Sequence, residues 1–343
     1  AMFLSACTAR FPEFLRDAVA KHPHLMETYR FHIDSHCLGK YYPLSGDCGS
    51  VAAQVPNYVG MTFTPLATQP GLYASWTYLP ASCYTLLYRL FELSGDPCYL
   101  QTAWQGNGGK ADGFPHDLYL DPAEAEAMRT RIDTTIAEKG ATPDLGSVNK
   151  QQWHLAILRS GVGENARALW LDYDSGGGHG HADGMNLGFF ARGLDVMPEF
   201  GYPPVQYGGW TSPRARWYTM SAAHNTVVVD GKNTAPGNAE TTLWLDAPGA
   251  HAIRAGGGAM VPIKRYERTV LLVDISEEAC YAVDVFRVTG GHDHLKFMQS
   301  HFGTVRTEGL TLAAAPDFDA SMMLRNVQAD PAPAPGWQAA WTF

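Results

Sequence analysis

The sequence has few cysteines, no long apolar run and no surplus of positive charge. No stretch of about eighteen apolar residues occurs, so we expect no membrane-spanning helix. The 6 cysteines form no CxxC pair and are too sparse in 343 residues for a disulfide scaffold, so we expect buried free thiols. The net charge of −9 argues against nucleic acid as a partner, because binding phosphates needs a positive face.

The rest of the composition is that of a globular chain. Hydrophobic residues make up 45% and charged residues 17% of the sequence, which supplies ample core material. A length of 343 residues corresponds to about two domains. Because the chain is acidic overall, an anionic polymer would need a local positive site to bind to it.

The first part of the chain predicts helices. Apolar residues recur at helical spacing in "FPEFLRDAVAKH" (11–22) and more strongly in "ASCYTLLYRLFELSGD" (81–96), where Asp96-Pro97 stops the pattern. A third helix is predicted at 121–140, with Asp121 as its N-cap, Pro122 at its first position and Gly140 beyond its end.

After about residue 146 the pattern changes to short runs rich in Val, Leu and aromatic residues. "ARALWLDYD", "HNTVVVDGK" and "RYERTVLLVDIS" are separated by Gly, Asp and Asn, as in a series of antiparallel strands. Several such strands in a row predict a sandwich or a barrel. We therefore expect a helical region first and an all-β region second, with the boundary near residues 143–150.

Histidines follow a glycine-rich turn in "SGGGHGHADG" (175–184). If this segment lay on a strand, His179, His181 and Asp183 would point to the same side, a spacing that suits metal ligands. A second candidate group is His224, at the start of a strand, and the segment "GLDVMPEFGY" offers Asp195 and Glu199. Two histidines and a carboxylate would make a three-ligand zinc site, whereas a histidine that only completes a turn is the structural alternative.

Three segments carry a resemblance to a known family. "ALWLDYDSGGGHGHADGMNLGFFARGLDVMPEFGY", "AAHNTVVVDGK" and "YAVDVFRVTGGHDHLKF" occur in this order and resemble the heparinase II/III-like polysaccharide lyases, which include alginate, heparin and ulvan-type lyases. The resemblance covers about residues 158–303 and is looser before that. It implies an α+β multidomain fold, with the C-terminal part of an (α/α) toroid at 1–146 and a large antiparallel β-sandwich at 147–343.

The resemblance also implies a site. Its zinc ligands correspond to His181, Glu199 and His224, and this sequence has Glu where many relatives have Asp. The first histidine of the turn, His179, corresponds to a residue that faces the sugar carboxylate. Relatives have a catalytic Tyr on the loop ahead of "AHNTV", and we expect it to be Tyr207.

The chemistry of such a lyase explains these residue types. Elimination across a uronic acid requires that the carboxylate be neutralised, that a base remove the C5 proton and that an acid protonate the leaving oxygen. Tyr207 is expected to supply the acid and also the base. Trp210, Arg214 and Arg216, on the same loop, are the expected substrate-binding residues, and Tyr218 is the alternative phenol.

Other interpretations remain open at this stage. The chain lacks a convincing Asn-His pair of the kind that relatives carry on earlier toroid helices, so we expect part of the catalytic set to lie upstream. A zinc-containing carbohydrate-binding or assembly module without activity of its own is the main alternative. "HGHADG" also approaches the HxHxDH motif of metallo-β-lactamase-like hydrolases, but Gly184 stands where the last His would be.

The resemblance implies an anionic polysaccharide or oligosaccharide as partner and a periplasmic or secreted location. The sequence does not specify which uronate polymer, nor endo or exo action, and a homodimer stays an open alternative. "AMFLSACTAR" at the start is too short and lacks a basic first region, so we do not expect it to be a signal peptide.

Overall fold

A computed structural model describes residues 2–55, 81–257, 259–316 and 320–342. The chain divides into two compact units. Ala1–Tyr42 and Gln54–Gly146 make up the first unit, and Pro43–Ala53 and Ser147–Phe343 make up the second. The sequence assigned all of residues 1–146 to the first part, whereas the short segment Pro43–Ala53 packs with the second unit.

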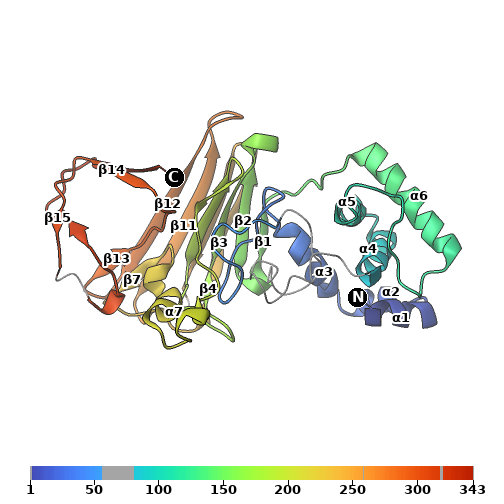
Figure 1. The fold of residues 1–343 in the computed structure, drawn as a ribbon, viewed down its shortest axis with the longest axis horizontal. Coiled ribbons are helices and arrows are strands. Elements are labelled where there is room, and N and C mark those ends of the chain that lie inside the picture. Colours follow the sequence, from blue (N-terminus) through green and yellow to red (C-terminus); the bar gives the residue numbers. More distant parts are fainter. Residues whose placement is uncertain (1, 56–80, 258, 317–319, 343) are drawn as a thin grey trace. The chain divides into compact units, whose positions relative to one another are not determined.

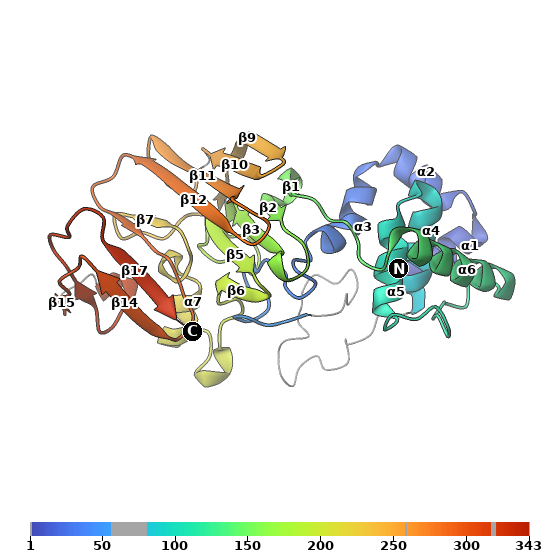
Figure 2. The ribbon, with the colours of Figure 1, turned by 90° about the horizontal axis from the view of Figure 1, so that it is seen from above.

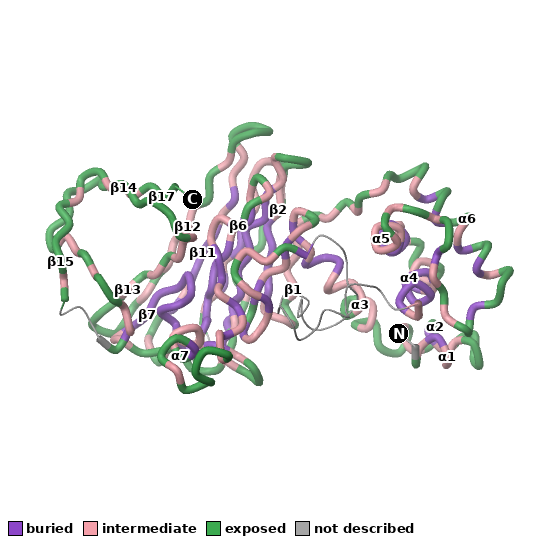
Figure 3. The backbone as a smooth tube through the Cα atoms, viewed as in Figure 1, coloured by how far each residue is buried: buried purple, intermediate pink, exposed green. Residues whose placement is uncertain are grey.

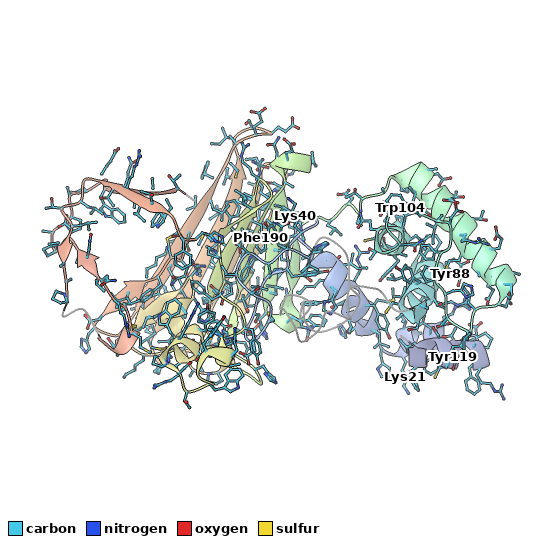
Figure 4. The ribbon with its side chains drawn as sticks, viewed as in Figure 1. Lys21, Lys40, Tyr88, Trp104, Tyr119 and Phe190 are labelled. Carbon is cyan, nitrogen blue, oxygen red and sulfur yellow. The ribbon has the colours of Figure 1, made fainter. Side chains whose placement is uncertain are left out.

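Six helices joined by turns and loops make up most of the described part of the first unit (Figure 1). The helices are α1 (Met2–Arg10), α2 (Phe14–Lys21), α3 (His24–Asp34), α4 (Ala81–Ser94), α5 (Pro97–Gly106) and α6 (Pro122–Lys139). Their core contains Leu86, Leu87, Leu90, Leu100, Met128 and Ile132. Tyr88 and Trp104, on α4 and α5, are labelled in Figure 4 and pack in and against this core.

The predicted helices are confirmed as α2, α4 and α6. Asp121 caps α6 by accepting hydrogen bonds from the backbone of Ala123 and Glu124, and Gly140 follows the helix with φ +80°. Asp96 and Pro97, expected only to end a helix, also begin the next one. The Asp96 side chain accepts a hydrogen bond from Cys98 N at 2.9 Å, and Pro97 occupies the first position of α5.

The second unit contains two main antiparallel sheets (Figures 1 and 2). The first has the order β1-β2-β3-β5-β6, and the second has the order β12-β11-β10-β9. The strands of the first sheet are β1 (Val148–Lys150), β2 (Leu155–Ser160), β3 (Arg167–Asp172), β5 (Asn186–Ala191) and β6 (Leu194–Met197). Those of the second are β9 (Glu240–Ala247), β10 (Ala250–Gly256), β11 (Arg265–Asp274) and β12 (Cys280–Thr289).

The two sheets share one apolar core, so they form a sandwich. Side chains of both sheets meet in it: Leu158, Leu171 and Leu187 from the first, and Ile253, Val270 and Leu272 from the second. Every named strand that the structure describes pairs antiparallel with its neighbours. The predicted order, helices first and an antiparallel sandwich second, is therefore confirmed, and membership of the helices in a toroid stays a prediction.

Smaller elements surround the sandwich. Two-stranded pairs join β4 (Asp174–Ser175) to β8 (Gly237–Asn238), β7 (Val227–Val229) to β13 (His294–Lys296), β14 (Thr304–Glu308) to β17 (Gln338–Thr342) and β15 (Ala313–Ala314) to β16 (Gln328–Ala329). The central strands are buried, whereas β14, β15 and β17 are mostly exposed (Figure 3). The short helices η4 (Val205–Tyr207), α7 (Pro213–Tyr218) and η5 (Ser221–Ala223) precede β7.

Two expectations from composition can be compared with this fold. None of the helices in the described part of the chain is both long and apolar enough to cross a membrane. The 6 cysteines, all of them among the described residues, form no disulfide; Cys37, Cys83 and Cys98 are buried, and the other three are partly exposed.

Candidate metal centre

The glycine-rich turn connects β4 to β5, and glycine is required within it. A Cβ on Gly180 would lie 2.0 Å from the carbonyl oxygen of Gly176, and Gly176 itself has φ +81°. Gly176 N donates to the His181 carbonyl at 2.8 Å and closes the turn. The backbone therefore folds tightly enough to direct His181 into the interior of the unit.

The two histidines of this turn differ in burial. The segment 179–181 is a turn rather than a strand, and His179 has φ +61°. The His179 side chain is 83% exposed, whereas that of His181 is 0% exposed. The condition for residues i and i+2 to point the same way is therefore not met, because that rule applies only to extended backbone.

Three buried ligand candidates come together in the second unit. His181 comes from the turn, Glu199 follows β6, and His224 lies between η5 and β7; one ligand atom from each lies within 4.8 Å of the others. The residues are 2%, 3% and 0% exposed. The Nδ1 atom of His224 lies 2.8 Å from Oε2 of Glu199, and the two imidazole rings are 5.4 Å apart.

This group leaves two ring nitrogens without a hydrogen-bond partner. They are Nδ1 of His181 and Nε2 of His224; within the described part of the chain neither makes a hydrogen bond, although the Tyr218 backbone lies close enough to the His224 ring to raise its pKa. A buried polar atom without a partner is costly, so each such atom needs an explanation. A metal ion would bind both nitrogens in place of protons, and two imidazole nitrogens with one carboxylate are the donor set of a zinc site with an open position.

The Glu199 carboxylate is held in place from both sides. Asn186 donates its side-chain N–H to Oε2 of Glu199 at 2.8 Å, and Gly201 N donates to Oε1 at 3.3 Å. Asn186 is itself fixed, because its Oδ1 accepts a hydrogen bond from Asn225 N at 2.9 Å. These hydrogen bonds leave the Glu199 carboxylate little freedom to rotate away from the two histidines. The sequence did not single out the two asparagines that take part in them.

The electrostatics keep Glu199 charged despite its burial. Burial alone would raise the pKa of Glu199, but His224 and then His181 hold that pKa below its usual value. Burial would lower the pKa of His224, and Glu199 raises it above the ordinary value instead. For His181, burial and the nearby His224 lower the pKa, so its ring stays neutral and able to bind a metal.

The other acids named from the sequence lie outside this group. Asp183 is buried and accepts a hydrogen bond from Gly46 N at 3.3 Å, and burial raises its pKa to about 6. Asp195 lies on β6, and burial raises its pKa to about 6 as well. Neither is among the described residues that could jointly hold a metal.

The loop ahead of β7 carries the expected sugar-facing residues on the surface. Tyr207 is 69% exposed at the end of η4, and the Arg214 guanidinium carbon lies 5.9 Å from the centre of its ring. Trp210 is 49% exposed, with its ring 5.6 Å from that of Tyr202. Arg216 is exposed on α7. The structure thus pairs Tyr207 with Arg214.

Tyr218, the alternative phenol, is partly buried and packs against Phe200, with ring centres 5.4 Å apart. In the described chain, no hydrogen bond or ion pair joins Tyr207 to His179. A Cβ at position 184 would lie 2.9 Å from Sδ of Met260, so a His there would require the Met260 side chain to move. That steric limit disfavours the HxHxDH alternative.

Comparison with known proteins finds similarity over part of the second unit. Residues 148–292 match the family described as heparinase II/III-like, C-terminal. The resemblance predicted from the sequence is confirmed over this segment. The exo-oligoalginate lyase of Saccharophagus degradans is 30% identical over 217 residues, which cover 58% of this chain and 28% of that protein.

Solved structures with partial similarity include two polysaccharide lyases. A heparinase III matches with a TM-score of 0.45 and 17% identity, over 66% of this chain and 40% of that one. The heparan sulfate lyase of Pedobacter heparinus matches with a TM-score of 0.38 and 14% identity, over 80% of this chain and 53% of that one. The chain spans only part of each of these proteins.

Proposed function

We propose that this chain is part of a polysaccharide lyase that cleaves a uronate-containing polysaccharide or oligosaccharide by β-elimination, in the periplasm or outside the cell. The observation that carries this proposal is the buried group of His181, Glu199 and His224, with its two unsatisfied ring nitrogens, inside the segment that matches the lyase family. The exposed His179, two residues from His181, supports a sugar-binding surface beside it.

In this proposal His181, Glu199 and His224 hold one zinc ion. When bound, zinc would mainly tie the glycine-rich turn to the segment ahead of β7, because its ligands come from these two places and from the end of β6. The chain's own residues would perform the reaction on the exposed side of the turn.

The reaction needs charge neutralisation and proton transfer. His179 and Arg214 would face the substrate carboxylate and stabilise the charge that develops on it when the C5 proton leaves. Tyr207 would take that proton as phenolate. The electron pair then forms the C4–C5 double bond, the bond from C4 to the leaving oxygen breaks, and the phenol returns the proton to that oxygen. Trp210 and Arg216 would hold neighbouring sugars on the exposed loop.

A panel of uronate polymers and oligomers, scored by absorbance of the new C4–C5 double bond, tests the activity. Tyr207→Phe should lower the rate about 10²–10⁴-fold, the usual contribution of a general acid or base, and leave zinc content and thermal stability unchanged. Tyr281→Phe is a matched control, because Tyr281 is also exposed in the second unit, at 48%. Full activity in Tyr207→Phe would transfer the role to Tyr218.

The second candidate is a zinc-containing carbohydrate-binding or assembly module without activity of its own. It is favoured by the fact that the chain spans only 28% of the exo-oligoalginate lyase that it resembles. Such a module would retain uronate oligosaccharides and release no unsaturated product. The same panel, with retention measured beside absorbance, separates the two functions.

A further inference from the structure

Asp47 connects the exposed and the buried histidine of the glycine-rich turn. It lies in the segment Pro43–Ala53, which packs as part of the second unit. Its side chain is 7% exposed. Oδ1 of Asp47 lies 3.0 Å from Nε2 of His181, and Oδ2 lies 3.1 Å from Nδ1 of His179. One carboxylate thus contacts both rings, across 134 and 132 residues of sequence.

The backbone around Asp47 is fitted to this turn. Asp47 N donates to the His179 carbonyl at 2.8 Å. Gly46 has φ +60°, and a Cβ there would lie 2.5 Å from the same carbonyl oxygen, so the close approach requires glycine. Gly46 N also donates to Oδ2 of Asp183 at 3.3 Å. These contacts hold the backbone of Gly46 and Asp47 against the glycine-rich turn.

The contact with His181 has a chemical consequence. A carboxylate only accepts hydrogen bonds when it is charged, so Nε2 of His181 must carry the proton that faces Asp47. The Nδ1 atom then carries a lone pair, and this is the nitrogen that has no partner among the described residues. Carboxylates that accept from the second nitrogen of a ligand histidine fix both its tautomer and its ring orientation.

We propose that Asp47 is a positioning residue for both histidines. It holds His181 in the tautomer and orientation that present Nδ1 to a metal, and through its other oxygen it holds the exposed His179 ring. The inference rests on the proposed zinc centre and extends it, because the metal site and the sugar-facing histidine then depend on the same carboxylate.

Zinc affinity of the full chain, measured by competition with a chelator and without any substrate, tests this role. Asp47→Ala should bind zinc about 10–100-fold more weakly than the unmodified chain, the usual effect of removing such a partner. Asp47→Asn keeps the shape and one acceptor oxygen, so its loss should be smaller. Asp246→Asn is the matched control, because Asp246 also contacts a histidine, His251, in the same unit.

A second readout separates positioning from general stabilisation. With Co²⁺ in place of zinc, Asp47→Ala and Asp47→Asn should shift the visible absorption bands, and Asp246→Asn should not. His179→Ala should keep the zinc affinity of the unmodified chain, because it lies on the other oxygen of Asp47. Unchanged affinity and an unchanged Co²⁺ spectrum in Asp47→Ala would overturn the inference.

The remaining outcomes are also decisive. If Asp47→Ala lowers the unfolding temperature equally with and without zinc, while affinity is unchanged, Asp47 only stabilises the fold and the inference is wrong. If the unmodified chain itself binds no zinc, the proposed metal centre fails, and the inference fails with it. Unchanged zinc affinity in Asp47→Ala would refute only the role of Asp47 and leave the proposed function intact, whereas absence of zinc binding in the unmodified chain would refute the metal centre itself.

Discussion

Removal of zinc should destabilise the second unit by an amount that follows from mass action. A ligand that binds only the folded state adds about 2.7 kcal/mol to the free energy of unfolding at a free concentration of 100 Kd, and about 4.1 kcal/mol at 1,000 Kd. For a unit of about 200 residues, 1 kcal/mol shifts the unfolding temperature by about 2–4 °C. The unfolding temperature of the second unit should therefore be about 5–16 °C higher in saturating zinc than in excess chelator.

His224→Ala should abolish this zinc-dependent shift. The substitution also removes the partner of a carboxylate that is 3% exposed, so the variant is destabilised even in chelator, by about 3–5 kcal/mol if the pair is charged. The informative quantity is therefore the difference between zinc and chelator within each variant. His179→Ala is the matched control, because that side chain is 83% exposed and outside the ligand group, and it should keep the full shift.

Differential scanning calorimetry measures the unfolding temperature, and metal analysis measures the zinc content. The unmodified chain should contain about one zinc per molecule, as expected for one three-ligand site. A chain that contains no zinc and unfolds at the same temperature in zinc and in chelator would refute the metal centre. A full zinc shift in His224→Ala would show that the ion binds elsewhere.

Two further predictions concern burial and the turn. Burial raises the pKa of Asp195 from 3.8 to about 6, so protonated Asp195 stabilises the fold below about pH 4, and this stabilisation is lost as the pH rises through about 6. The free energy of unfolding of Asp195→Asn, relative to that of the unmodified chain, should therefore increase by up to about 3 kcal/mol between pH 4 and 7. A difference that stays constant over this range in denaturant titrations would contradict it. Gly180→Ala places a Cβ 2.0 Å from a backbone oxygen, so it should destabilise the unit by more than about 1 kcal/mol and weaken zinc binding. Gly178→Ala, where a Cβ meets nothing within 4 Å, is its control, and equal effects of the two in the same calorimetric assay would refute the steric explanation.

The sequence by itself determined the elements whose causes are local. The ends of α6 follow from Asp121, Pro122 and Gly140, because capping and φ preferences act within a few residues. The change from helical to strand periodicity after residue 146 predicted the order of the two structural classes. His181, Glu199 and His224 were predicted as a set through the family resemblance, and residues 148–292 match that family.

Only the tertiary structure decided how the two turn histidines lie and which acid contacts them. His179 is exposed and His181 is buried, because they lie in a closed turn with a left-handed residue and not on a strand. Asp47 contacts both rings although it lies more than a hundred residues before them, and it packs with the second unit, not the first. Such contacts depend on how strands and turns pack in the folded chain, and the residues near Asp47 in the sequence do not specify its partners.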